Sequence, residues 1–355
     1  MTPVDENRWK TWTEEDIIKA CIVMGKAMST IKQTIRYLRY IENEYGVNLH
    51  QHPDKVHAEF LEKFVIMKRG EEKEHSIRNA TKAMKLLFIS LGVAPVRYIW
   101  PKTHSSDPQI VVVPDDAVYN MINGEYTKDK WLNATFQHIF HWIFYSGART
   151  PSEINMLKIG KKYIDFDVRR VTWWQPKVRS WRTSYFPKFV VSSPVDKSLR
   201  HYIEYVRPQL ADREPKEGEP VFVNQYGEPF TPNYLRCKLS SFGKKYYSSF
   251  HPYAARHTCF TNWLVRSYLR HRVMDIMGLK LFANHKDISS TMVYVHPAEQ
   301  IIMEYQQRQH IGKYMPGKRS KKNFNAQKTV AQNSICKSHR IPPSPLLITP
   351  YICCV

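Results

Sequence analysis

Apolar residues recur at helical spacing in four consecutive stretches that fill the first quarter of the chain. Apolar residues that repeat every three or four positions are typical of an amphipathic helix with one buried face. The first stretch opens at Thr13, a natural N-cap, and the second ends at Gly46, a natural helix terminator. The third is expected after Pro53 and the fourth from about Ser76. The pattern predicts a four-helix domain over residues 1–92, with basic residues on the outer helix faces.

The helical periodicity stops between residues 93 and 114, where four prolines flank a short polar segment. Proline fixes φ and lacks an amide proton, so several prolines close together favour an extended connection over another helix. We therefore expect a linker over residues 93–114.

Residues 115–310 carry both helical and strand patterns, which predicts a second domain of the α+β type. Three segments are rich in β-type residues and suggest a small antiparallel sheet, over 163–166, 170–174 and 184–191. Helices are expected around this sheet, over 117–123, 131–145, 195–206, 232–246, 254–268 and 273–281, with one more through Glu153 and Leu157. The chain as a whole is expected to be mainly α.

The charge balance points to a polyanionic partner. The sequence holds 53 Lys and Arg against 32 Asp and Glu, a formal net charge of +21. Such an excess favours nucleic acid as the partner, with an anionic membrane surface as the second candidate. No apolar run reaches the ~18 residues that a membrane-spanning helix needs, and residues 1–10 do not resemble a signal segment. We expect no membrane association.

The six cysteines do not form a metal-binding pattern. Only Cys353 and Cys354 are close in sequence, and adjacent cysteines do not make a zinc knuckle. We expect free thiols in a reducing compartment and no structural metal. Residues 311–355 contain eight Lys or Arg and no Asp or Glu, which predicts a basic tail. The tail is either flexible or packed on a partner subunit or on DNA.

Five residues could together cleave a phosphodiester. His285 precedes Tyr294 by nine residues, Arg149 follows a glycine after an apolar helix, Lys177 lies between two strand patterns, and Arg256 opens a helix. Arginine can bind phosphate oxygens bidentately, lysine or histidine can protonate the leaving oxygen, and tyrosine can hold the DNA as a phosphotyrosyl ester. Each residue alone fits an ordinary surface or core role, and their joint order favours the catalytic one. Such chemistry requires no metal and no other cofactor.

Three motifs resemble those of the tyrosine recombinase, or integrase, family. They are Y-S-G-A-R-T-P-S-E-I at 145–154, A-A-R-H-T at 254–258 and N-H-K-D-I-S-S-T-M-V-Y-V-H at 284–296. The resemblance covers roughly residues 13–300. It implies an N-terminal core-binding domain and a C-terminal catalytic domain that close on DNA as a clamp.

The resemblance also implies a role for each candidate residue. Arg149 and Arg256 would hold the scissile phosphate and His285 would support it. Lys177 would be the general acid on a hairpin, and Tyr294 would be the nucleophile.

The chain departs from the family pattern at three places. Tyr253 stands where the family usually has a histidine, and it can donate a hydrogen bond to phosphate although a phenol is a poor base at neutral pH. Thr150 is an apparent insertion that moves Glu153 by one position, and Asn284 replaces the usual glycine before the histidine. Departures at the histidine position are associated with integrases of archaeal viruses and plasmids.

Three functions are compatible with these patterns. The leading one is a site-specific recombinase of a mobile element that acts as a homotetramer on double-stranded DNA attachment sites, in the cytoplasm of a prokaryotic host. A DNA-binding relative that has lost catalysis would explain Tyr253. A type IB topoisomerase-like enzyme would share the chemistry and act as a monomer.

Overall fold

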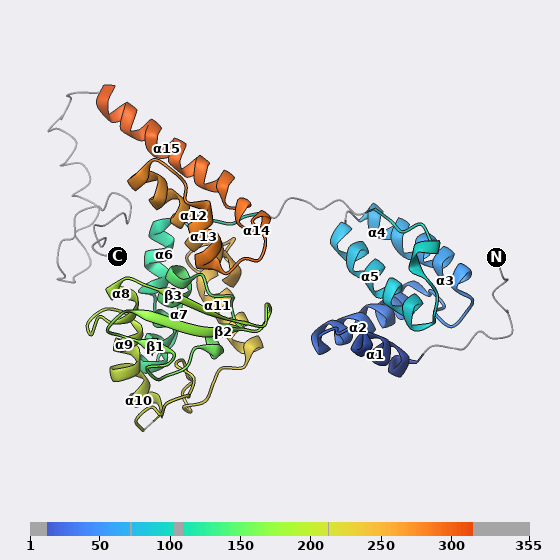
Figure 1. Cartoon of the computed structure of the whole chain (residues 1–355), viewed down its shortest axis with the longest axis horizontal. Coiled ribbons are helices and arrows are strands. Elements are labelled where there is room, and N and C mark those ends of the chain that lie inside the picture. The colour runs from blue at the N-terminus through green and yellow to red at the C-terminus, as the bar shows by residue number, and fades with distance from the viewer. Residues whose placement is uncertain (1–12, 72, 103–108, 212, 315–355) are drawn as a thin grey trace, which may run out of the picture. The chain divides into compact units, whose positions relative to one another are not determined.

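The computed structural model describes residues 13–71, 73–102, 109–211 and 213–314. The chain divides between Gln109 and Ile110 into an N-terminal unit and a C-terminal unit (Figure 1). The segment boundaries expected at 92/93 and 114/115 do not coincide with this division. Val93, Tyr98 and Trp100 already pack against the core of the N-terminal unit, because apolar residues lie between the prolines.

All regular secondary structure in the described part of the N-terminal unit is helical. Its elements are α1 (Glu14–Val23), α2 (Met28–Tyr45), α3 (Pro53–Glu59), the π-helical segment η2 (Phe60–Val65), α4 (Ile66–Gly70), α5 (Glu74–Ser90) and the 3-10 turn η3 (Pro95–Arg97). Thr13 caps α1 in a reciprocal arrangement with Asp16, and Gly46 ends α2 in the left-handed conformation. The helix boundaries predicted at these two residues are confirmed.

The C-terminal unit combines helices with one antiparallel sheet. Strands β1 (Ile164–Asp165), β2 (Arg170–Gln175) and β3 (Ser180–Tyr185) pair in the order β1-β2-β3, and Gln175 lies opposite Ser180 where β2 and β3 meet their turn. The helices preceding the sheet are α6 (Asp115–Ile122), α7 (Lys130–Ser146) and the 3-10 turn η4 (Ile154–Met156). The mainly helical fold with a small antiparallel sheet is confirmed.

The remaining helices follow β3 in the chain. They are α8 (Lys188–Val191), α9 (Leu199–His201), the π-helical η5 (Tyr202–Val206), α10 (Arg207–Ala211), α11 (Pro232–Lys244), α12 (Pro252–His271), α13 (Ile276–Ala283), α14 (Ser289–Met292) and α15 (Val295–Tyr314). Helix α12 packs against α7, α11, α13 and α15, so it is the central support of the unit. The basic tail expected over 311–355 begins inside α15, and from residue 315 on it lies outside the described residues.

Two local predictions are wrong. The strand expected over 184–191 is instead β3 over Ser180–Tyr185, where buried and exposed side chains alternate, and residues 188–191 form the short helix α8 after Pro187. The helix expected through Glu153 is only a single 3-10 turn. Here the carboxylate of Glu153 accepts hydrogen bonds from two side chains of β2, and the backbone does not continue as a helix.

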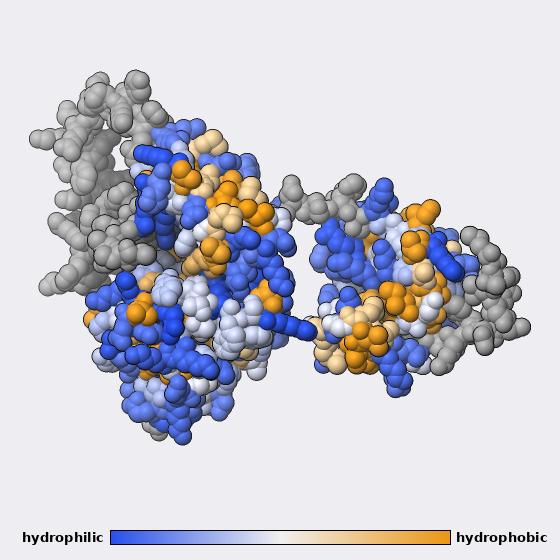
Figure 2. Space-filling view, in the orientation of Figure 1, coloured by the Kyte–Doolittle hydropathy of each residue, from blue (hydrophilic) through white to orange (hydrophobic). Residues whose placement is uncertain are grey.

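Each unit buries its own apolar residues. The visible face of the C-terminal unit is mostly hydrophilic, whereas hydrophobic residues gather over α1 and α2 of the N-terminal unit (Figure 2). Ile22, Val23 and Met28 are among these exposed residues. No helix within the described ranges combines the length and apolarity needed to cross a membrane.

Candidate active site

Arg149 follows a sharp backbone reversal at the end of α7. Gly147 ends this helix with φ of 60° in the left-handed region, and a Cβ at that position would collide with the ring of Phe260. Only glycine combines this conformation with so close an approach. The reversal sends the chain toward the sheet, and Arg149 forms an ion pair with Glu153 at 2.8 Å.

Glu153 is the buried anion of the site. Its side chain is fully buried and accepts hydrogen bonds from Arg149 (2.8 Å), the Trp173 indole (2.9 Å) and the Gln175 amide (3.1 Å). Burial raises the pKa of this carboxyl, but the bonds from Trp173 and Arg149 outweigh burial and hold the pKa below its ordinary value. Glu153 therefore stays ionised and fixes the first arginine against the sheet.

Arg256 lies on α12 and is completely buried. Its guanidinium donates to the carbonyl of Gly147 at 2.5 Å and to that of Ala283 at 3.3 Å, so it bonds the ends of both α7 and α13. The ring of Phe260 lies 4.3 Å from its Cζ. Its Nε has no hydrogen-bond partner among the described residues. Burial and the charge of Arg149 lower the pKa of Arg256.

His285 is held as a neutral ring by two neighbours. Its Nε2 lies 3.2 Å from Nη2 of Arg256, and its Nδ1 lies 2.9 Å from the hydroxyl of Thr291. A guanidinium can only donate, so Nε2 accepts and Nδ1 carries the proton that is donated to Thr291. Burial, followed by the charges of Arg256 and Arg149, lowers the pKa of His285 to about 4, which is consistent with this tautomer.

Tyr294 lies beside these groups and is 3% exposed. Its ring is nearly parallel to that of His285, with centroids 6.3 Å apart, and it meets the ring of Phe260 edge-on at 5.3 Å. Burial raises the pKa of the Tyr294 hydroxyl to about 12, against the opposing effect of Arg256. The structure thus brings together Arg149, Arg256, His285 and Tyr294.

The other two candidates lie at the surface. Lys177 is exposed in the turn 176–179 between β2 and β3, which confirms the hairpin location that the sequence predicted for it. Tyr253 is 38% exposed, and its ring meets that of His257 edge-on at 4.7 Å. His251, two residues before Tyr253, has its ring centroid 6.2 Å from that of His257. The catalytic roles of all six candidates stay predictions.

Sequence reasoning did not identify Arg182 as a site residue. It is 2% exposed on β3, donates to the carbonyl of Ser146 at 2.9 Å, and lies between the rings of Trp173 and Phe282. Its Nε and Nη1 have no partner among the described residues, and burial lowers its pKa to about 9. The alternation of β3 could have revealed it, because Arg182 and Ser184 occupy the inward positions.

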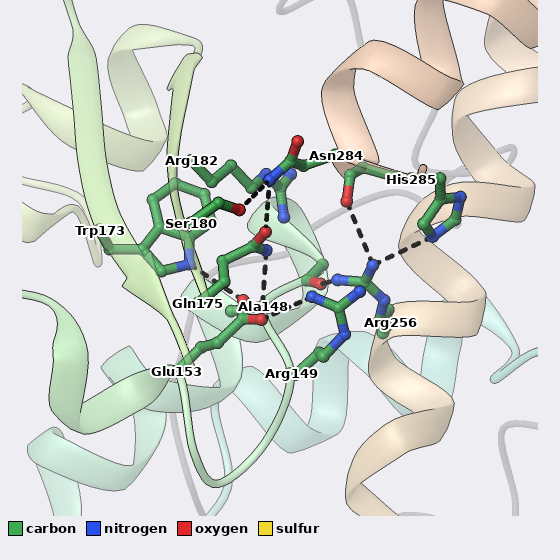
Figure 3. A network of polar contacts seen from close by, with 12 residues as sticks. Ala148, Arg149, Glu153, Trp173, Gln175, Ser180, Arg182, Arg256, Asn284 and His285 are labelled. Carbon is green, nitrogen blue, oxygen red and sulfur yellow. Dashed lines mark hydrogen bonds and ion pairs between the residues drawn. The ribbon is translucent and has the colours of Figure 1, made fainter. Parts of the chain in front are cut away.

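A chain of hydrogen bonds connects these elements, as Figure 3 shows. The amide of Asn284 donates to Gln175 at 2.7 Å and to Ser180 at 3.1 Å, and Gln175 donates to Glu153. The residue that replaces the usual glycine therefore contacts the sheet. Within the described parts of the chain, no group of three or more His, Cys, Asp or Glu is arranged to hold a metal ion.

The arrangement is suited to binding an anion. Three guanidiniums lie close together, those of Arg149, Arg182 and Arg256. The described part of the C-terminal unit has a single buried carboxylate, that of Glu153, to balance their charge. Buried cations are costly unless an anion or hydrogen-bond acceptors compensate them. Unpaired donors on Arg182 and Arg256 leave capacity for a ligand with several acceptor oxygens.

Curated relatives match about a third of the chain or less. The tyrosine recombinase XerC of Lactobacillus delbrueckii subsp. bulgaricus is 29% identical over 114 residues, which cover 31% of this chain and 36% of the relative. XerC of Bacillus licheniformis is 32% identical over 99 residues, covering 26% of this chain and 31% of the relative. This chain thus spans about a third of the length of these relatives.

Solved structures share the fold over most of the chain. The XerH site-specific recombinase bound to palindromic difH substrate superposes with a TM-score of 0.56 and 14% identity, covering 83% of this chain and 84% of that one. The Tn1549 transposon integrase in complex with a circular intermediate DNA gives 0.56 and 16% identity, covering 80% and 95%. Residues 116–300, more than half of the sequence, match the family model described as "Phage integrase family". This chain belongs to the phage integrase family.

Proposed function

We propose that this protein is a site-specific DNA recombinase that cuts and rejoins DNA through a 3′-phosphotyrosyl intermediate. The observation that carries the proposal is the fully buried Arg256, which lies beside Arg149, His285 and the hydroxyl-bearing Tyr294. A scissile phosphate would supply the anion that these cations lack. A tyrosine next to such a phosphate is a competent nucleophile once its charge is offset.

The residues divide the chemistry among them. Arg149 and Arg256 bind the non-bridging oxygens and stabilise the charge that develops on phosphorus. The oxygen of Tyr294 attacks phosphorus as its proton passes to solvent water, the bond between phosphorus and the 5′-oxygen breaks, and Lys177 protonates that oxygen. His285 orients Arg256 through their mutual hydrogen bond and supports the phosphate. Attack by the freed 5′-hydroxyl of another strand reverses these steps and restores Tyr294.

Tyr253 takes a lesser role in this scheme. It is partly exposed at the start of α12, three residues before Arg256, and it is close enough to Arg256 and Tyr294 to affect the pKa of both. Its phenol donates a hydrogen bond to the phosphate in place of the usual histidine. Removal of this one hydroxyl leaves the nucleophile and both arginines in position.

DNA binding must precede the chemistry in this scheme. Tyr294 is 3% exposed and its pKa is about 12, so in the free protein it is protonated and covered. The segment that carries Tyr294 has to shift when a duplex places its phosphate against Arg256. The excess of positive charge, +21 for the chain, attracts the duplex and makes binding salt-dependent.

The wider reaction that we propose is integration of a virus or plasmid. Four protomers assemble on two attachment sites, exchange one pair of strands, form a Holliday junction and then exchange the second pair. The N-terminal unit contributes basic helix faces to the duplex. The charge of the chain and its membership of the integrase family support this scheme.

Covalent trapping tests the proposal. Wild-type protein, Tyr294→Phe and the matched control Tyr253→Phe are incubated with nicked duplexes from a randomised library. We expect an SDS-stable protein–DNA adduct with wild type and Tyr253→Phe and none with Tyr294→Phe. DNA binding without an adduct from any variant would favour a DNA-binding relative that has lost catalysis. An adduct together with relaxation of a separate supercoiled plasmid by protein that stays monomeric would favour a topoisomerase-like enzyme.

A further inference from the structure

Asn284 occupies a backbone conformation that does not require its side chain. It ends α13 in the left-handed region, with φ of 52° and ψ of 49°. Glycine adopts this conformation more readily than asparagine. Backbone geometry alone therefore gives no reason for an amide at this position, and the contacts of that amide need another explanation.

The amide of Asn284 spans the base of the β2–β3 hairpin. Its Nδ2 donates to Oε1 of Gln175, the last residue of β2, and to Oγ of Ser180, the first residue of β3. Gln175 and Ser180 are paired across the two strands and enclose the turn 176–179. The Asn284 side chain thus bonds to both ends of the turn that presents Lys177. Asn284 is also the residue directly before His285.

The orientation of the Gln175 amide is fixed from the other side. Glu153 is fully buried and ionised, so its carboxylate can only accept, and Gln175 must direct Nε2 toward it. Oε1 of Gln175 then faces Asn284 and requires a donor there. The hydrogen bonds run without interruption from Arg149 through Glu153 and Gln175 to Asn284 (Figure 3).

We propose that Asn284 is a positioning residue: its amide holds the base of the hairpin against the His285 turn, and thereby places Lys177 at the leaving oxygen. This inference rests on the proposed function, in which Lys177 is the general acid. A hairpin held only by the pairing of its strands would be mobile at the turn. A displacement of a catalytic group by about 1 Å can lower the rate roughly 100-fold.

The chain offers two informative substitutions at this position. Asn284→Gly keeps the left-handed backbone favourable and removes both hydrogen bonds. Asn284→Asp keeps the size and shape of the side chain but replaces the amide donor with an acceptor, so the bond to Oε1 of Gln175 is lost, whereas the hydroxyl of Ser180 can still donate to the carboxylate. Thermal unfolding of both variants should show only a modest loss of stability, because the buried Oε1 of Gln175 loses its donor but neither variant leaves a cavity in the apolar core.

The test compares two leaving groups in single-turnover cleavage. One duplex carries an ordinary phosphodiester, and its match carries a sulfur in place of the bridging 5′-oxygen. A thiolate leaves without protonation, so cleavage of the second duplex does not need a general acid. We expect Asn284→Gly and Asn284→Asp to cleave the phosphodiester about 10- to 100-fold more slowly than wild type and the sulfur-containing duplex within about 3-fold of it. Lys177→Ala provides the reference for complete loss of the acid.

A second measurement does not depend on catalysis. Amide hydrogen exchange over residues 175–183 of the full-length protein should be roughly 10-fold faster in Asn284→Gly, because two hydrogen bonds that hold the hairpin are lost. Exchange in α7 should be unchanged.

Three outcomes would overturn the inference. Wild-type rates on both duplexes would leave Asn284 as a helix terminator only. Equal slowing on both duplexes would place the defect at the phosphate rather than at the acid. If wild-type protein cleaved neither duplex, the proposed function would fail and this inference with it, whereas the first two outcomes leave the proposed function standing.

Discussion

The two units of this chain differ in how the charge of their buried side chains is compensated. In the described part of the N-terminal unit, Lys68 is the buried charged side chain, and it forms an ion pair with Glu71 at 2.8 Å. In the C-terminal unit, the buried Arg182 and Arg256 donate to backbone carbonyls. Among the described residues, neither arginine forms an ion pair with a carboxylate.

The difference separates a structural role from a functional one. The carboxylate of the exposed Glu71 offsets the charge of the buried Lys68 ammonium, so Lys68 needs no ligand. Arg207 shows that the C-terminal unit can do the same, since it pairs with Glu219 at 2.7 Å, far along the chain from the three family motifs. Buried arginines that bond only to carbonyls and to a neutral histidine keep their net charge. That excess, concentrated beside Tyr294, is what a phosphate would neutralise.

The largest expected effect comes from the buried anion of the C-terminal unit. Glu153→Ala leaves the donors of Arg149, Trp173 and Gln175 without their acceptor, and it should lower the free energy of unfolding by about 3–5 kcal/mol. Glu14→Ala is the matched control in the N-terminal unit, where the carboxylate pairs with Arg39 at the surface, and it should cost less than ~1 kcal/mol. Urea unfolding measures both, and equal losses would contradict the comparison.

Acid should destabilise the C-terminal unit more than the N-terminal unit. Burial lowers the pKa of His138 and of His141 to about 3, from an ordinary value of 6.5. The unfolded chain therefore binds protons that the folded unit does not, and stability falls as the pH drops below about 6.5 toward these values.

Between pH 7 and pH 5 these two histidines alone should lower the free energy of unfolding of the C-terminal unit by about 2 to 4 kcal/mol. Hydrogen exchange in each unit at the two pH values measures the change. The N-terminal unit should respond less, because its His57 is only half-buried. The double variant His138→Gln, His141→Gln should show a smaller loss of stability between pH 7 and pH 5 than wild type, with the remainder due to other histidines whose pKa is lowered by burial, such as His285. Identical profiles for the two units would break the comparison.

The smallest expected effect concerns the exposed cations of the N-terminal unit. Arg36 lies exposed on α2, whereas Arg39 on the same helix is already paired with Glu14. If α2 contacts the duplex, Arg36→Ala should weaken DNA binding a few-fold and lower the slope of log K against log salt by about 1. Arg39→Ala should change both quantities less. Unchanged affinity and slope in Arg36→Ala would exclude this helix face from the interface.

The sequence was sufficient for the parts of the fold that depend on local patterns. Thr13 and Gly46 mark helix ends because caps are set by neighbouring residues, and the hairpin at Lys177 follows from the strands beside it. Residues 184–191 were misjudged because apolar residues after a proline suit a strand and a short helix equally well.

The polar network could not be predicted, because its members are distant in sequence. Gln175 and Asn284 are 109 residues apart, and neither belongs to a pattern that would pair them. In the sequence, Arg182 resembles its solvated neighbours, and only the register of β3 shows that it points inward. Burial of a charge is decided by tertiary packing, and a single sequence does not reveal it.

The most direct test of the central claim is to identify the residue that becomes attached to DNA. Wild-type protein trapped on a nicked duplex is digested, and the peptide that carries the nucleotide is sequenced by mass spectrometry. The account predicts attachment at Tyr294, the tyrosine beside the buried Arg256. Attachment at Tyr253 or at any other of the 21 tyrosines would contradict it.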